Sequence, residues 1–301
     1  MSATQTEMTH ASAKGFDTRP PEEALAILAM AQVEAARVVQ EAVTDIAKAA
    51  RLAADCVASG GRLVYAAAGS SGLMALADAL ELPGTYGIAR DRIKVLLAGG
   101  IAGLSGMEGG PEDDGDAARR EIAEAGVCAG DCLIALTASG YTPYPLAAVD
   151  AARQAGASTI GISNNRGASL FDKVDVAICL PTPPEVIAGS TRMGAGTAQK
   201  ITLNMLSTMM AIHLGHVHDG FMVNVIADNA KLRDRARRIV MAVSEVPESA
   251  AAAALEQAGG AVKVAILLAA GAGDVDDAKL VLAQNAGHVR ASLKALGRQG
   301  L

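Results

Sequence analysis

Short apolar runs of β-forming residues alternate along this chain with helical stretches, and this alternation limits the possible folds more than any other feature. Five such runs precede residue 181: Arg62–Ala66, Ile93–Leu97, Cys132–Leu136, Ser158–Ile162 and Val174–Leu180. Strands that alternate with helices are typical of a parallel sheet covered on both faces. The pattern therefore predicts an α/β fold, a doubly wound and mostly parallel sheet in a three-layer αβα sandwich over roughly residues 45–215.

Helices are predicted on both sides of this region of the sequence. Pro20-Pro21-Glu22-Glu23 opens an N-terminal helical region, because proline is tolerated in the first turn and acidic residues there complement the helix dipole. A long helix is predicted over 192–214, and shorter ones over 248–257, 261–268, 274–284 and after Gly287. We expect an N-terminal leader with helices (1–44), a central α/β domain (45–240) and a small C-terminal helical domain (241–301).

The composition excludes several classes of protein. A chain of 301 residues, 51% hydrophobic and 19% charged, has enough apolar material for a folded core. Aromatic residues make up only 2% and the net charge is −6, so the chain lacks both the stacking platforms and the basic surface of a nucleic-acid-binding protein. We therefore expect a small-molecule or protein partner and no nucleic acid.

The sequence also argues against a membrane segment and a metal site. The polar N-terminus, MSATQTEMTHASAKGFD, differs from a signal peptide, and the most apolar later stretch, 264–270, is too short to span a membrane. The four cysteines, Cys56, Cys128, Cys132 and Cys179, lack the paired C-x₂-C spacing of a zinc site. We expect a cytoplasmic protein without a metal.

The turn Gly69-Ser70-Ser71-Gly72 follows the first predicted strand and opens a helix. Its backbone N–H groups and two hydroxyls can point at one anion, which the positive end of the helix also favours. It is neither a dinucleotide fingerprint nor a P-loop, because no lysine follows. The turn indicates either a phosphate site or an ordinary strand-to-helix connection.

Two further hydroxyl-rich segments strengthen the phosphate interpretation. Ser139, Gly140 and Thr142 lie just after the third strand, where ligands of open α/β sheets collect. Ser190 and Thr191 precede the long helix, and they either contact the ligand or cap that helix. Neighbouring hydroxyl turns without a lysine suit a monophosphate better than a polyphosphate.

Carboxylates are the natural general acids and bases of a metal-free sugar site. The candidates near the predicted turns are Glu81, Glu108, Glu112, Asp113, Asp114 and Glu185. Spacing alone does not choose among them, since each also suits a solvated or helix-capping position.

Several motifs in this order carry a family resemblance: AGSSG (68–72), LPGTYG (82–87), ASGYTPY (138–144), PEVIAGSTRM (184–193), AGTAQK (195–200) and NMLST (204–208). They resemble the N-acetylmuramic acid 6-phosphate etherases, which have the sugar isomerase (SIS) fold and are related to glucokinase regulatory protein. The resemblance covers nearly the whole chain. It implies an SIS-type sandwich followed by a small UBA-like helical domain.

The resemblance implies a carbon–oxygen lyase that cleaves the lactyl ether of N-acetylmuramic acid 6-phosphate, giving N-acetylglucosamine 6-phosphate and D-lactate without a cofactor. Glu81 matches the family's general acid and Glu112 its general base. The resemblance also implies that this chain forms a homodimer with the site near the subunit interface. Asn229 and Lys231 are then expected to contribute to that site. The remaining expected sugar-phosphate contacts are Ser70, Ser71, Gly72, Ser139, Gly140, Thr142, Glu185, Ser190 and Thr191.

The chain departs from the family at three cations, where Leu73, Tyr141 and Gly194 stand instead of arginine, arginine and lysine. Each exchange removes a charged partner for phosphate, lactyl carboxylate or a neighbouring subunit. Two alternatives therefore stay open: a regulator that binds a sugar phosphate without converting it, and an SIS sugar-phosphate isomerase with Glu185 as base.

Overall fold

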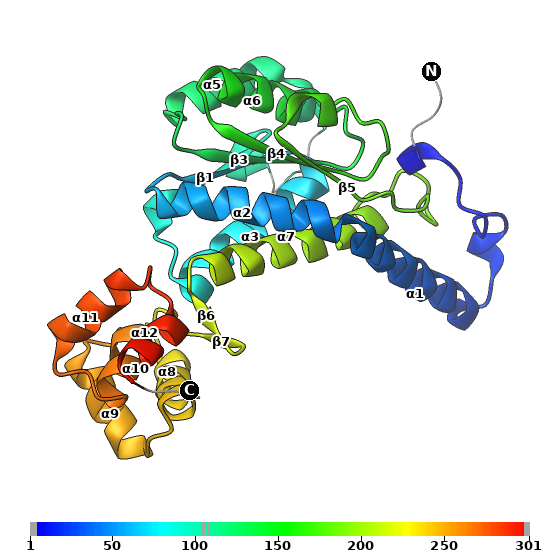
Figure 1. Cartoon of the computed structure of the whole chain (residues 1–301). Coiled ribbons are helices and arrows are strands. Elements are labelled where there is room, and N and C mark those ends of the chain that lie inside the picture. The colour runs from blue at the N-terminus through cyan, green and yellow to red at the C-terminus, as the bar shows by residue number, and fades with distance from the viewer. Residues whose placement is uncertain (1–4, 104–105, 107–108, 298–301) are drawn as a thin grey trace. The chain divides into compact units, whose positions relative to one another are not determined.

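Five parallel strands form the central sheet of the computed structural model, which describes residues 5–103, 106 and 109–297. The strands are β1 (Leu63–Ala67), β2 (Ile93–Leu97), β3 (Cys132–Thr137), β4 (Ser158–Ser163) and β5 (Val176–Cys179), in the order β2-β1-β3-β4-β5. Each coincides with a predicted apolar run. The predicted parallel sheet is confirmed (Figure 1).

Helices cover both faces of this sheet. Figure 1 shows α5 (Gly115–Glu124) and α6 (Pro143–Gln154) on one face, and α2 (Val43–Ala58), α3 (Gly69–Tyr86) and α7 (Gly194–His213) on the other. Every residue of β1 and β3 is buried, as expected of central strands covered on both sides. The three-layer αβα prediction is therefore confirmed.

The N-terminal region is helical, as predicted. Helix α1 (Pro21–Arg37) begins with proline in its first turn, followed by Glu22 and Glu23, and continues through a short 3₁₀ segment into α2. The remaining short elements are α4 (Gly100–Gly103) and the 3₁₀ helices η1 (Gln5–Glu7), η2 (Phe16–Thr18), η3 (Val38–Ala42), η4 (Arg90–Arg92), η5 (Gly110–Asp113) and η6 (Phe171–Lys173).

The strand order creates a crevice at the carboxyl ends of two adjacent strands, β1 and β3. β1 continues into α3 on one face, whereas its neighbour β3 continues into α6 on the opposite face. Between the carboxyl ends of two such strands the connections diverge and leave a crevice, where open α/β sheets bind their ligands. The first two predicted hydroxyl turns follow these two strands.

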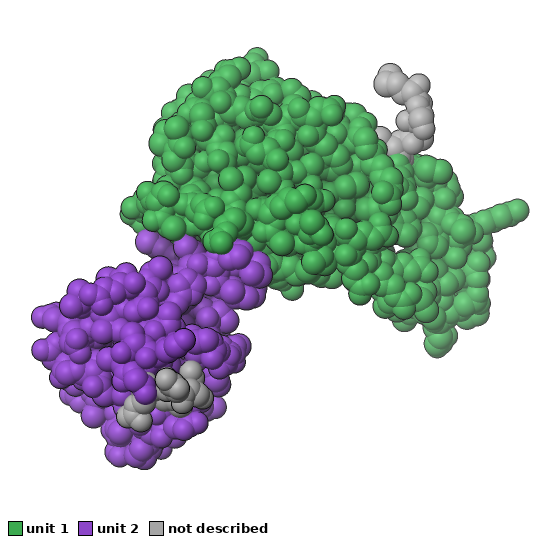
Figure 2. All heavy atoms as spheres, viewed as in Figure 1, with its two compact units in different colours: residues 1–80, 91–207 green, residues 81–90, 208–301 purple. Residues whose placement is uncertain are grey.

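The chain forms two compact units, residues 1–80 with 91–207 and residues 81–90 with 208–301 (Figure 2). The second contains a hairpin, β6 (Val217–His218) and β7 (Phe221–Met222), and the helices α8 (Ala230–Ser244), α9 (Glu248–Gln257), α10 (Val262–Ala269), α11 (Val275–Gln284) and α12 (Val289–Ala295). The domain boundary expected at 240/241 falls inside α8, whose Ile239 and Val240 are buried in the core of this unit.

The hairpin was not anticipated. Its turn residues, Asp219 and Gly220, both have positive φ, as a type I′ hairpin turn requires. None of the helices among the described residues is both long and apolar enough to cross a membrane.

Candidate functional site

The first hydroxyl turn is itself the beginning of helix α3. The helix starts at Gly69, two residues after β1 ends, and its first backbone bond runs from the Gly72 N–H to the Ala68 carbonyl at 3.0 Å. The amides that precede this bond have no acceptor within the helix. Together with the Ser70 and Ser71 hydroxyls beside them, these amides offer hydrogen-bond donors of the kind with which a helix N-terminus can bind an anion.

Three hydroxyl groups form a connected cluster in the second turn, between β3 and α6. The Oγ1 atoms of Thr137 and Thr142 are 2.7 Å apart, and Ser139 Oγ lies 3.2 Å from each of them. Gly140 makes the sharp bend possible: its φ is +82°, and a Cβ there would lie 2.1 Å from the Cβ of Ala168. The turn therefore requires glycine and presents hydroxyls held in fixed positions.

These turns line one cavity of about 240 Å³ in the first unit. Six of the expected site residues come together in its wall: Ser70, Ser71, Glu112, Ser139, Thr142 and Thr191. The other described lining residues are Thr6, Glu7, Ala68, Gly69, Leu136, Thr137, Ala138 and Gly189. The cavity lies at the crevice that the strand order creates.

Glu112 reaches this cavity from η5, which follows β2. Pro111 packs against Gly99, two residues after the end of that strand, where a Cβ on the glycine would lie 3.1 Å from the proline Cγ. A Cβ on Gly69 would lie 3.9 Å from Glu112 Oε2, so the carboxylate is beside the first turn. Asp114 instead caps α5, accepting the Ala117 N–H at 2.8 Å, and Glu108 lies outside the described residues.

Some expected residues shape the site without lining it. Gly72 packs against β2, because a Cβ there would lie 3.2 Å from Leu97 Cδ2. Ser190 contributes backbone bonds to the loop before α7. Glu185 is buried, and its two oxygens accept the N–H groups of Gly194 and Ala195 at 3.0 and 2.9 Å. It therefore caps the N-terminus of α7.

Glu81, Asn229 and Lys231 belong to the second unit. Glu81 is exposed on α3, and Lys231 is exposed near the start of α8. Asn229 is the N-cap of α8, where its side-chain oxygen accepts the Leu232 N–H at 2.9 Å. Their roles stay predictions.

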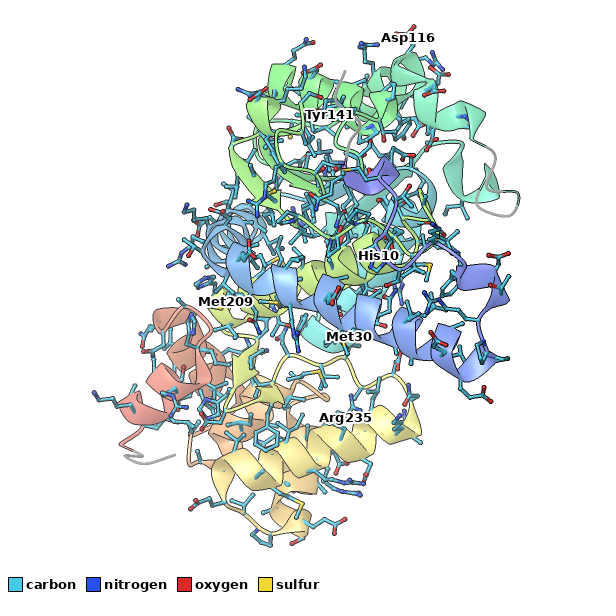
Figure 3. The ribbon with its side chains drawn as sticks, turned by 90° about the vertical axis from the view of Figure 1, so that its right-hand side faces the viewer. His10, Met30, Asp116, Tyr141, Met209 and Arg235 are labelled. Atoms are coloured by element: carbon cyan, nitrogen blue, oxygen red, sulfur yellow. The ribbon has the colours of Figure 1, made fainter. Side chains whose placement is uncertain are left out.

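The described lining of the cavity holds two carboxylates, Glu7 and Glu112, and neither lysine nor arginine. The residues that replace the expected cations do not supply a positive charge. Leu73 is exposed. The hydroxyl of Tyr141 donates to the Gly167 carbonyl at 2.8 Å, and Figure 3 labels the Tyr141 side chain. Hydroxyl and backbone N–H groups are therefore the hydrogen-bond donors that this wall can offer to an anion. Within the described residues, no group of three or more His, Cys, Asp or Glu side chains is arranged to hold a metal ion.

Two lining residues, Thr6 and Glu7, were not anticipated. They lie in the polar leader, which carries no periodic pattern and no recognisable turn motif. Their position depends on a long-range contact that the local sequence does not indicate. The Thr6 N–H donates to Asn165 Oδ1, and these two residues are 159 positions apart.

Two SIS domain family models match the chain, over residues 28–164 and 123–214. The N-acetylmuramic acid 6-phosphate etherase of Deinococcus radiodurans is 42% identical over 88% of this chain and 87% of that protein. The chain belongs to the N-acetylmuramic acid 6-phosphate etherase family. Proteins with the same name from Geobacillus thermodenitrificans (38% identity, 96% of this chain and 98% of that one) and Mycolicibacterium smegmatis (38%, 98% and 99%) match this etherase-family chain over almost its full length.

Proposed function

We propose that this protein is a lyase that cleaves the D-lactyl ether of N-acetylmuramic acid 6-phosphate, producing N-acetylglucosamine 6-phosphate and D-lactate in cell-wall recycling. The observation that carries the proposal is the convergence of three hydroxyl-bearing segments and Glu112 on one cavity. Membership of the etherase family supports the choice of substrate.

The phosphate group is held by the first two turns. The N-terminus of α3 supplies backbone N–H groups and the hydroxyls of Ser70 and Ser71, and the Thr137–Ser139–Thr142 cluster supplies further donors. A hydroxyl both donates and accepts, so the cluster can turn its hydrogens toward an anion.

Elimination begins on the ring-opened sugar, whose aldehyde acidifies the proton at C2. Glu112 removes this proton, the electron pair forms the C2=C3 double bond, and the bond from C3 to the lactyl oxygen breaks. Glu81 gives a proton to the departing oxygen, which completes D-lactate. Water then adds its oxygen to C3 and a proton to C2, so the sum consumes one water without net oxidation or reduction.

The test is D-lactate release from N-acetylmuramic acid 6-phosphate by the purified parent, Glu112→Gln and Glu81→Gln. We expect the parent to release D-lactate and each variant to lose about 10²–10⁴-fold in kcat, the usual contribution of a general acid or base. Glu124→Gln, an exposed glutamate at the end of α5, is the matched control and should retain parental activity.

Other outcomes would point to the alternatives. A folded parent that binds N-acetylglucosamine 6-phosphate but releases no D-lactate would be a sugar-phosphate regulator. Aldose–ketose conversion would indicate an isomerase, against which the engagement of both Glu185 oxygens with the start of α7 already weighs.

We also propose that the protein acts as a homodimer in the cytoplasm, with the site near the subunit interface and Asn229 and Lys231 contributing to it. Helix α1 supports the dimer, because Leu25, Met30 and Val33 on it are exposed. The cavity of about 240 Å³ is smaller than the roughly 300–1,000 Å³ of most ligand pockets, as expected of a site with a missing wall. The four free cysteines support a reducing compartment.

A further inference from the structure

The N-terminal segment enters the wall of the cavity through η1 (Gln5–Glu7). Thr6 is only 2% exposed, although the residues after it lie at the surface. Its N–H donates to Asn165 Oδ1 at 3.2 Å, and Asn165 Nδ2 donates to Thr6 Oγ1 at 3.1 Å. This reciprocal pair of bonds fixes Thr6 next to the carboxyl end of β4.

Asn165 also holds the second hydroxyl turn. Its buried Nδ2 donates to the carbonyl oxygens of Ala138 and Ser139 at 3.0 and 3.1 Å. One amide group therefore links the N-terminal segment to the turn that carries the hydroxyl cluster. The position of Thr6 and the geometry of that turn depend on each other.

Fixing Thr6 places the next residue, Glu7, in the cavity wall. A Cβ on Gly189 would lie 3.3 Å from Glu7 Oε2, so the carboxylate is beside the loop that carries Thr191. Glu112 lies beside a different segment, at Gly69. The two carboxylates thus enter the wall from separate elements, and the catalytic scheme uses only Glu112.

The charge of Glu7 decides what it can bind. A carboxylate repels a phosphate dianion at close range, so Glu7 is not a phosphate ligand. An ionised carboxylate only accepts hydrogen bonds, and the donors of a sugar phosphate away from its phosphate are chiefly hydroxyl groups. Such charge-assisted bonds are stronger than those between neutral groups.

We propose that Glu7 is a specificity-determining residue that accepts a hydrogen bond from a hydroxyl group of the bound sugar. Thr6 is a positioning residue that holds Glu7 in place through Asn165. This assignment rests on the proposed function, in which the cavity binds a sugar phosphate.

The experiment compares Glu7→Gln and Thr6→Val with the parent and with the control Glu124→Gln, an exposed glutamate at the end of α5. KM and kcat are measured by D-lactate release, and calorimetry measures the binding of N-acetylglucosamine 6-phosphate and of inorganic phosphate. For Glu7→Gln we expect KM and the product's Kd to rise about tenfold, the effect of one lost charge-assisted bond, with a much smaller change in kcat. Inorganic phosphate should bind at least as tightly as to the parent, because a repelling charge is gone.

One further variant, Glu7→Asp, and the Thr6→Val variant make the test more specific. Glu7→Asp keeps the charge but retracts it by one methylene, so we expect weaker sugar binding without any gain for inorganic phosphate. Thr6→Val removes the bond from Asn165 to Thr6 Oγ1 while keeping the side chain's shape, and should change sugar binding in the same direction as Glu7→Gln by a smaller factor.

The proposal is overturned if Glu7→Gln leaves KM and product affinity unchanged, or if it weakens sugar phosphate and inorganic phosphate equally, as a merely structural role would. Tighter binding of both ligands would show that the segment plugs the cavity, and would also overturn it. Failure of the proposed function is a separate result, in which the parent releases no D-lactate. A parent that binds without turnover still tests Glu7 through calorimetry.

Discussion

At the scale of single residues, the largely buried Lys263 side chain lowers the stability of the folded protein. It lies on α10, its Nζ donates to the Gly287 carbonyl at 3.1 Å, and no described ion pair includes it. Burial lowers the pKa of Lys263 to about 8. The unfolded chain, with the ordinary pKa of about 10.4, binds this proton more strongly, so the penalty is fully present below pH 8 and disappears as pH rises toward 10.5.

We therefore expect Lys263→Met to raise the free energy of unfolding by about 1–3 kcal/mol at pH 7, with a smaller gain at pH 10. Urea unfolding at the two pH values measures this. Burial, followed by the charge of Lys263, also lowers the pKa of His216 to about 4, so NMR titration of the variant should show that pKa rising.

Lys279→Met is the control for this prediction, because Lys279 is exposed on α11 and its pairing with Asp276 is a surface contact. It should change stability by less than about 0.5 kcal/mol. A Lys263→Met protein less stable than the parent at pH 7 would contradict the argument, since it would show that the bond to Gly287 outweighs desolvation.

At the scale of elements, helix α7 depends on a carboxylate that precedes it. Glu185 accepts two N–H groups at the helix N-terminus from a buried position. In Glu185→Gln, one of these N–H groups would face the amide NH₂ and the favourable interaction with the helix dipole would be lost. We expect a loss of about 1–3 kcal/mol in the free energy of unfolding, measured by urea denaturation.

The exposed Glu124→Gln substitution, the same exchange without a buried partner, should leave stability within about 0.5 kcal/mol. If Glu185→Gln were as stable as the parent, the two backbone bonds would contribute nothing, and α7 would owe its start to packing alone.

The elements themselves could largely be predicted, because apolar periodicity and strong punctuation define them locally. Pro21 with two glutamates marks the start of α1, and the strand β3 ends at its hydroxyl turn as predicted. The first turn is different: the helix after β1 begins at Gly69, so Ser70, Ser71 and Gly72 lie within the helix instead of forming a separate turn before it. The hairpin was missed although Asp219-Gly220 is a strong turn signal, since its strands are only two residues long.

The residues of the candidate site likewise fall into those that local sequence patterns predict and those that long-range contacts place. Ser70, Ser139 and Thr142 were predictable because the carboxyl ends of adjacent parallel strands meet at one sheet edge. Thr6 and Glu7 were not, because their place in the wall depends on bonds to Asn165, far away in the sequence. Local sequence patterns therefore identify the site residues that follow the strands. The site residues of the N-terminal leader can be recognised only in the folded structure.

At the scale of the whole molecule, the surface of α1 is the feature that supports the proposed homodimer. Leu25, Met30 and Val33 expose 64%, 56% and 45% of their surface, and at 3.6 residues per turn they fall within an arc of about 140°. This helix is held to the body of its own unit at Gln32, whose Oε1 accepts a hydrogen bond from Thr197 Oγ1 at 2.6 Å. The exposed apolar residues on either side of Gln32 are therefore presented in a fixed orientation.

We expect the parent to have the mass of two protomers in light scattering, and the double variant Leu25→Glu/Met30→Glu to have the mass of one. A charge buried without a partner costs several kcal/mol, enough to separate a modest interface. Because the proposed site lies near that interface, D-lactate release should fall with dissociation and recover partly at high protein concentration. Leu280→Glu, an equally exposed leucine on α11, is the control and should stay dimeric. A double variant that remains dimeric and active would place the subunit contact elsewhere, and the exposed face of α1 would then need another explanation.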